Sequence, residues 1–136
     1  MSELLHRLRQ RFFGKPAAPP RPLPPPEPEP DEIHVPELSV AELREVLHSD
    51  QPPLLLDVRE PYEWRQVHLP AALHIPMNEI PHRLAELPQT SVIVVFCAHG
   101  MRSYDVAGYL IDHGYQASSL AGGITEWVRS GGEYER

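Results

Sequence analysis

The chain has 136 residues, of which 41% are apolar, with one cysteine and a formal net charge of −7. This length allows one domain and a tail, whereas a single cysteine excludes an internal disulfide and favours a reducing, cytoplasmic compartment. The acidic balance argues against nucleic acid as a partner, because phosphate binding needs a basic face, and no stretch approaches the roughly 18 apolar residues of a membrane span.

Residues 1–15 are a basic N-terminal segment in which leucine and phenylalanine recur near helical spacing. A basic amphipathic helix of this kind can lie on an anionic membrane surface or dock on a protein. A solvated, frayed terminus and a mitochondrial presequence are the alternatives, and Glu3 and the scarcity of serine disfavour the presequence. A peripheral membrane contact or a protein contact through residues 1–15 therefore stays an open expectation.

Residues 16–31 are a proline-rich linker, since nine of the fifteen residues in 16–30 are proline. Proline fixes φ and has no N–H group, so neither a helix nor a central strand is expected. The segment is predicted to be a polyproline II spacer, although "RPLPPPEP" is also typical of a ligand for SH3-type domains.

Residues 32–136 alternate between strand-like and helix-like patterns. Three helix ends are marked by a capping box of Ser39 with Glu42, by Pro61 and by Gly114. Such alternation predicts an α/β domain built on a largely parallel sheet. Strands are predicted at 33–35, 53–58, 72–75, 91–96 and 117–120, and helices at 41–49, 60–68, 78–87, 103–113 and 122–130. The core is expected to include Trp64, Trp127 and one face of helix 103–113, namely Tyr104, Ala107, Gly108 and Ile111.

Polar residues follow two of the predicted strands. Asp57 and Arg59 lie at the end of "LLLDVR", and Cys97 follows "VIVVF". In open parallel α/β sheets, ligands bind beyond the carboxyl ends of the strands. If these two strands are neighbours in the sheet, both sets of residues face one crevice.

The loop that carries Cys97 joins a strand to a helix within a few residues. Gly100 permits a positive φ and a tight curl, which turns backbone N–H groups inward as an anion-binding nest. The helix that follows adds its free N–H groups and the positive end of its dipole. We therefore expect a lowered pKa for Cys97 and a fixed positive charge from Arg102 at the rim, an arrangement that activates a nucleophile.

Five motifs occur in this order along the chain: "DVREPYEW", "VHLPAALHIPMNEI", "VVFCAHGMRS", "AGYLIDHGY" and "LAGGITEW". Together they resemble the single-domain rhodanese-like sulfurtransferase family. The resemblance implies a rhodanese-like fold, with a five-stranded, mainly parallel sheet flanked by helices, over residues 32–136. It also implies that Cys97 is catalytic and carries sulfane sulfur as a persulfide. One departure concerns "VHLPAA", where Val67 and Ala71 replace glycines of the family pattern, so this turn is expected to be built differently.

Loop length separates two chemistries on this fold. The related dual-specificity phosphatases have the spacing C-x5-R, whereas Cys97 and Arg102 have the spacing C-x4-R. A smaller ring of amides suits one sulfur atom better than a tetrahedral phosphate, which favours sulfur transfer. We expect no metal or organic cofactor, because the eight histidines are scattered without metal-ligand spacing.

The predicted function is a ping-pong transfer of sulfur from a small anionic donor such as thiosulfate to cyanide, a thiol or a protein acceptor. The alternative is a rhodanese-like binding module tethered through its N-terminal arm. Asp57 is expected to hydrogen-bond the active-site loop, and Arg59 to pair with an acid such as Glu63. The residues predicted to bind the substrate around Cys97 are Ala98, His99, Gly100, Met101, Arg102 and Ser103.

Overall fold

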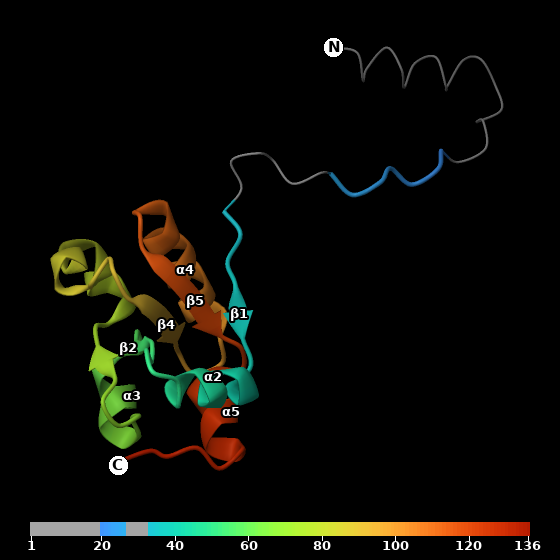
Figure 1. Cartoon of the computed structure of the whole chain (residues 1–136). Helices are drawn as coiled ribbons and strands as arrows, with labels where there is room; N and C mark the ends of the chain where they lie inside the picture. Colours follow the sequence, from blue (N-terminus) through green and yellow to red (C-terminus); the bar gives the residue numbers. More distant parts are fainter. Residues whose placement is uncertain (1–19, 27–32) are drawn as a thin grey trace, which may run out of the picture. The chain divides into compact units, whose positions relative to one another are not determined.

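The computed structural model describes residues 20–26 and 33–136 of the chain (Figure 1). Residues 20–26 are exposed and belong to no helix or strand. The predictions for residues 1–15 and for most of the linker lie outside the described residues. Within the described part of the chain, no helix is both long enough and apolar enough to cross a membrane.

Five strands form one sheet in the order β1-β5-β4-β2-β3, and every neighbouring pair is parallel (Figure 1). This confirms the predicted α/β fold. The edge strand lies slightly later than the predicted 33–35, because its pairing begins where the Ser119 N–H donates to the Pro36 carbonyl at 2.9 Å. The strands are β1 (Glu37–Leu38), β2 (Leu54–Asp57), β3 (Leu73–His74), β4 (Val92–Phe96) and β5 (Gln116–Leu120).

Helices connect the strands of the sheet, and their bounds are close to the predicted ones. The predicted capping box is present, since Ser39 and Glu42 exchange hydrogen bonds of 3.1 Å at the start of the first of them. The predicted helix 78–87 is instead two 3-10 turns, because Pro81 has no N–H to donate within an α-helix. The elements are α2 (Val40–Leu47), α3 (Pro61–Gln66), η1 (Met77–His82), η2 (Leu84–Glu86), α4 (Met101–Asp112) and α5 (Gly123–Arg129).

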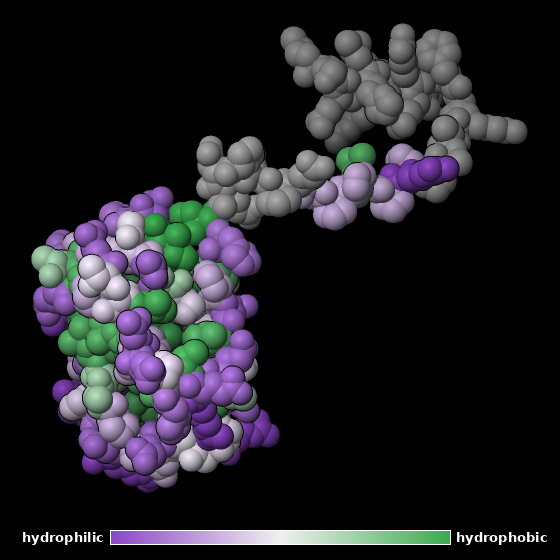
Figure 2. Space-filling model, viewed as in Figure 1, coloured by the Kyte–Doolittle hydropathy of each residue, from purple (hydrophilic) through white to green (hydrophobic). Residues whose placement is uncertain are grey.

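The two faces of the sheet each pack against their own apolar layer. Along β4, Ile93 and Val95 point into the layer that α4 covers, whereas Val94 and Phe96 point into the layer of α2 and α5. All four side chains are fully buried, as expected for a central parallel strand. On the face of residues 33–136 seen in Figure 2, apolar patches lie between polar and charged residues rather than in one continuous band.

Two expectations about the core are wrong. On α4 the buried residues are Ser103, Val106, Ala107 and Leu110. Tyr104 is 41% exposed, because a helix that turns Ser103 inward rotates the next residue by about 100°. Trp127 is buried as predicted, but Trp64 is only partly buried and stacks on two imidazole rings, those of His68 and His74.

The "VHLPAA" turn, residues 67–72, contains one unusual backbone angle. Ala71 has a φ of +61°, a left-handed conformation that costs a side-chain-bearing residue about 1 to 2 kcal/mol. Val67 is extended, with a φ of −159°, and therefore needs no glycine. Alanine at position 71 therefore adopts a strained backbone angle that glycine would adopt without this cost.

Candidate active site

Cys97 lies at the carboxyl end of β4, whose last four residues are fully buried. It follows β4 directly, and the last residue of β4, Phe96, is in register with Asp57 at the end of β2. The two strands that deliver polar residues are therefore neighbours, as predicted. The Cys97 side chain is almost fully buried.

The loop after Cys97 curls around its sulfur. The Gly100 N–H donates to Sγ at 3.1 Å and the Ser103 N–H at 3.4 Å, and the Ser103 hydroxyl lies 3.5 Å away. The curl depends on Gly100, whose φ is +108°, in the left-handed region that favours glycine. Because α4 begins at Met101, its first N–H groups have no acceptor within the helix and lie at this loop. We call the backbone from Cys97 to Ser103 the cradle.

The cradle lowers the pKa of Cys97. Burial alone raises the pKa, because it disfavours the charged thiolate. Hydrogen bonds from the Ser103 hydroxyl and from the backbone of Ser103, Gly100 and His99 outweigh the burial and leave the pKa below that of an ordinary thiol. The sequence-based expectation of a lowered pKa agrees with this geometry.

A buried pair of serine hydroxyl groups extends the cradle into the sheet. The Ser103 and Ser119 hydroxyl oxygens lie 2.8 Å apart, and both residues are fully buried. Ser103 is the only hydrogen-bond partner that the described residues give to the Ser119 hydroxyl. Donation from Ser119 to Ser103 therefore leaves the Ser103 hydrogen free to point at the Cys97 sulfur. Nothing in the sequence pattern marked Ser119.

The start of α5 forms backbone hydrogen bonds with the cradle. The Ile124 N–H donates to the Cys97 carbonyl at 2.9 Å, and the Thr125 N–H donates to the Ala98 carbonyl at 3.1 Å. This approach requires Gly123, since a Cβ there would lie 2.4 Å from the Cys97 carbonyl oxygen. The paired glycines Gly122 and Gly123 of "LAGG" are the signal that the sequence offers for this close approach.

Arg102 forms an ion pair with a carboxylate. Its Nη1 and Nη2 donate to the two oxygens of Glu63, at 2.7 and 3.0 Å. This ion pair lowers the pKa of Glu63 to about 2, despite partial burial, and raises that of Arg102. The sequence predicted the charge of Arg102 at the rim but not its partner, which lies 39 positions earlier on α3.

Asp57 and Arg59 are partners of each other. The Asp57 carboxylate accepts from Arg59 Nε at 3.0 Å, Nη2 at 2.8 Å and the backbone N–H at 2.9 Å. Arg59 also donates to the carbonyls of Glu63 and Val67. The expectation that Asp57 bonds the cradle is wrong. Arg59 does pair with an acid, as expected, but the acid is Asp57 and not Glu63. Both groups are buried, and a buried charge needs an immediate counterion; the pair fixes α3 instead.

The outer edge of the site is exposed and partly apolar. Met101, predicted to bind the substrate, is 82% exposed, and Tyr62 next to Glu63 is 59% exposed. His99 is also exposed, whereas Ala98 and Arg102 are half-buried. Among the described residues, no group of three or more His, Cys, Asp or Glu side chains could hold a metal ion.

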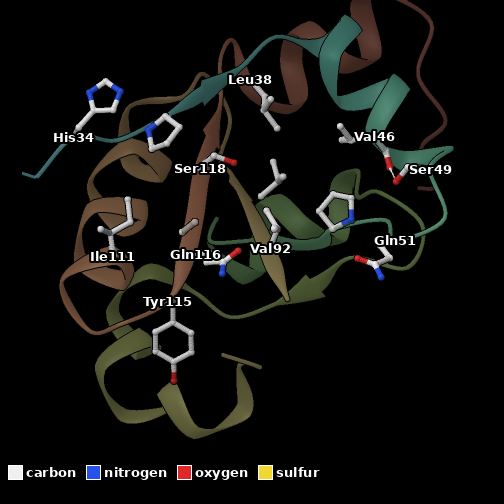
Figure 3. A pocket seen from close by; sticks show the side chains of 14 residues that line it. His34, Leu38, Val46, Ser49, Gln51, Val92, Ile111, Tyr115, Gln116 and Ser118 are labelled. Carbon is white, nitrogen blue, oxygen red and sulfur yellow. Dashed lines mark hydrogen bonds between the residues drawn. The ribbon is translucent and has the colours of Figure 1, made fainter. Parts of the chain in front are cut away.

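One cavity lies away from the cradle. Its volume is about 610 Å³, and its lining includes Val92 and Gln116, the first residues of β4 and β5. Figure 3 shows side chains of β1, α2, β4 and β5 around it. The cavity is therefore at the amino ends of the strands, and no residue of the cradle lines it.

Comparisons with known proteins agree with this fold and give the family. A family model for the rhodanese-like domain matches residues 39–130. A sulfurtransferase of Allochromatium vinosum is 39% identical over 98 residues, which are 71% of this chain and 92% of that protein. The thiosulfate sulfurtransferase GlpE of Pseudoalteromonas translucida is 30% identical over 91 residues, 66% of this chain and 86% of that protein. The crystal structure of a rhodanese-related protein from Thermoplasma volcanium has a TM-score of 0.68 and 28% identity, and the match covers 74% of this chain and 97% of that one.

Proposed function

This chain belongs to the rhodanese-like domain family, and we propose that it is a sulfurtransferase that carries sulfane sulfur as a persulfide on Cys97. The observation that carries the proposal is the Cys97 sulfur itself, which is buried and receives hydrogen bonds from Gly100 and Ser103. N–H groups that donate hydrogen bonds to a sulfur in this way stabilise its anion, the thiolate, which is the reactive form of a thiol. The chain is also similar to proteins named as sulfurtransferases.

In the first half-reaction the Cys97 thiolate attacks the outer sulfur of a donor such as thiosulfate. The sulfur–sulfur bond of the donor breaks, sulfite leaves with the electron pair, and a new sulfur–sulfur bond forms at Cys97. The first free N–H groups of α4, those of Met101 and Arg102, are the groups we assign to the terminal sulfur of the persulfide. The Arg102 guanidinium stabilises charge at the rim.

In the second half-reaction a thiol or cyanide attacks the terminal sulfur. The bond to Cys97 breaks, and the Cys97 thiolate leaves. The hydrogen bonds that lower the pKa of Cys97 also make its thiolate a better leaving group. The same cradle therefore favours both half-reactions.

Intact-mass spectrometry tests the proposal directly. After incubation with thiosulfate at high concentration, or with an organic persulfide, the wild type should gain about 32 Da, one sulfur atom. Cys97→Ala should gain nothing, and cyanide should remove the added mass from the wild type. If no sulfane donor loads the wild type, the domain is a rhodanese-like binding module instead.

A further inference from the structure

The edge of β5 that faces β1 is paired over only part of its length. The Ser119 N–H donates to the Pro36 carbonyl at 2.9 Å, and since every second residue of a parallel strand faces the same neighbour, Ala117 faces this edge too. In a continued ladder the Ala117 carbonyl would accept from the N–H of residue 36, but proline has none. The Ala117 N–H would donate to the His34 carbonyl, and the described residues form no such bond. Both backbone groups of Ala117 are therefore left without a strand partner.

The cavity at the amino ends of the strands opens at this incomplete edge. Ala117 and Ser118 both line it, and each is only 7% exposed. Figure 3 shows the Ser118 hydroxyl directed into the space that the lining side chains enclose, and no described residue forms a hydrogen bond with it. Polar groups this deeply buried are normally paired, because leaving them unpaired costs free energy. One N–H, one carbonyl and one hydroxyl thus face the cavity in want of a partner.

The rest of the cavity wall is apolar and without formal charge. Val94 is fully buried, and Leu38, Val46 and Ile111 are partly buried. None of the described residues that line the cavity is Asp, Glu, Lys or Arg. An ion would therefore lose its hydration here without gaining a counterion, whereas an uncharged, mainly apolar molecule meets no such cost.

We propose that this cavity is a second binding site, for an uncharged, mainly apolar small molecule that carries one amide-type group, with an N–H donor beside an oxygen acceptor. Such a group donates to the Ala117 carbonyl and accepts from the Ala117 N–H, as a further strand would, while the Ser118 hydroxyl orients it. The volume of about 610 Å³ lies within the roughly 300 to 1,000 Å³ of small-molecule sites, which combine apolar walls with a few polar groups. The site is separate from the cradle, because no residue from Cys97 to Ser103 lines it.

Fluorescence titration of the full chain with dansylamide tests the site. This probe is uncharged, carries N–H donors beside sulfonyl oxygen acceptors on an apolar ring, and emits more strongly in an apolar environment. The wild type should bind it saturably. The matched probe is dansylate, which has the same ring and a sulfonate in place of the sulfonamide. It should bind at least about tenfold more weakly, because its charge has no counterion in the cavity.

Two variants locate the bound probe. Val92 lines the cavity and is 48% exposed, so Val92→Trp fills the cavity without repacking the core and should weaken dansylamide binding at least about tenfold. Ser118→Ala removes the hydroxyl and should weaken it about fivefold, the effect of one hydrogen bond. The matched control Ser91→Ala changes a serine that does not line the cavity and should leave binding unchanged. The urea midpoint of each variant shows that it is folded.

These measurements do not involve Cys97, so their outcome is independent of the proposed sulfur transfer. Failure of the wild type to bind dansylamide up to its solubility limit would overturn the inference, as would saturable binding that persists in Val92→Trp. Equal binding of dansylamide and dansylate would overturn the assignment to uncharged ligands. A dimer in sedimentation that Val92→Trp dissociates would instead make the cavity an interface between copies of this chain, and the inference would be wrong.

Discussion

Replacing Gly123 with alanine tests whether α5 holds the cradle in shape. A Cβ at this position would lie 2.4 Å from the Cys97 carbonyl oxygen and 2.5 Å from that of Ala98. Both atoms belong to the backbone, so neither can move aside like the end of a flexible side chain. The start of α5 must then shift away and give up its hydrogen bonds to these two carbonyls.

The cost can be worked out from the contacts. A left-handed alanine costs about 1 to 2 kcal/mol, and each of the two lost hydrogen bonds is worth about 1 kcal/mol. Gly123→Ala should therefore lower the free energy of unfolding by about 3 kcal/mol, a large share of the roughly 5 to 15 kcal/mol of a typical domain. Gly131 is the matched control: its φ is +90°, but an added Cβ meets only the end of Arg44 at 4.0 Å. Gly131→Ala should cost about 1 kcal/mol, from strain alone.

Urea denaturation measures the free energy of unfolding of both variants. The rate of sulfur loading at Cys97 shows whether the cradle keeps its shape. The reasoning requires Gly123→Ala to lose about 2 kcal/mol more than Gly131→Ala and to load sulfur more slowly in the folded state. If both variants lose the same free energy of unfolding and load sulfur at the wild-type rate, the hydrogen bonds from α5 to the Cys97 and Ala98 carbonyls do not shape the site.

Three further predictions follow from single contacts. Ser119→Ala should raise the pKa of Cys97, because Ser103 loses the donor that directs its hydroxyl hydrogen to the sulfur. The pH profile of alkylation should therefore shift to higher pH in Ser119→Ala but not in Ser118→Ala, one residue earlier on β5. Because the pKa of Glu63 falls from 4.5 unfolded to about 2 folded, its contribution to stability is present above pH 4.5 and lost towards pH 2. Urea melts across that range should therefore show a steeper acid loss for the wild type than for Glu63→Gln, and parallel losses would contradict the pairing. Ala71→Gly should raise the free energy of unfolding by about 0.5 to 1 kcal/mol, since Ala71 is exposed and loses no packing; a destabilised variant would show that the left-handed turn is unstrained.

Helix starts and the central strand could be predicted from the sequence, because the residues that determine each of them lie within a few positions of one another. The Ser39 capping box, Pro61 at a first turn and the apolar run ending at Phe96 each act within a few residues. The cradle was predictable for the same reason, since Cys97 and Gly100 lie on one loop. The face of α4 was mispredicted at Tyr104, because the contact of Ser103 with the sulfur, and not the spacing of apolar residues alone, sets the rotation of the helix.

The partners of charged groups could not be predicted, because they depend on how helices pack. Arg59 has acids two and four positions away in sequence, and only the buried strand end decides that Asp57 takes its side chain. Arg102 meets Glu63 across two helices that share no sequence pattern. The loop motif therefore indicates the cysteine and the arginine, but not that the Arg102 guanidinium forms an ion pair with Glu63.

The cradle is held from both faces of the sheet, and this links reactivity to packing far from the motif. Cys97 belongs to the apolar layer that α4 covers, whereas Ile124, which donates to its carbonyl, belongs to the opposite layer with α2 and α5. Loosening either layer should therefore displace the amides that lower the pKa of the thiol. It follows that a rhodanese-like domain can keep its Cys-x4-Arg loop unchanged and still lose activity through a substitution on the last helix.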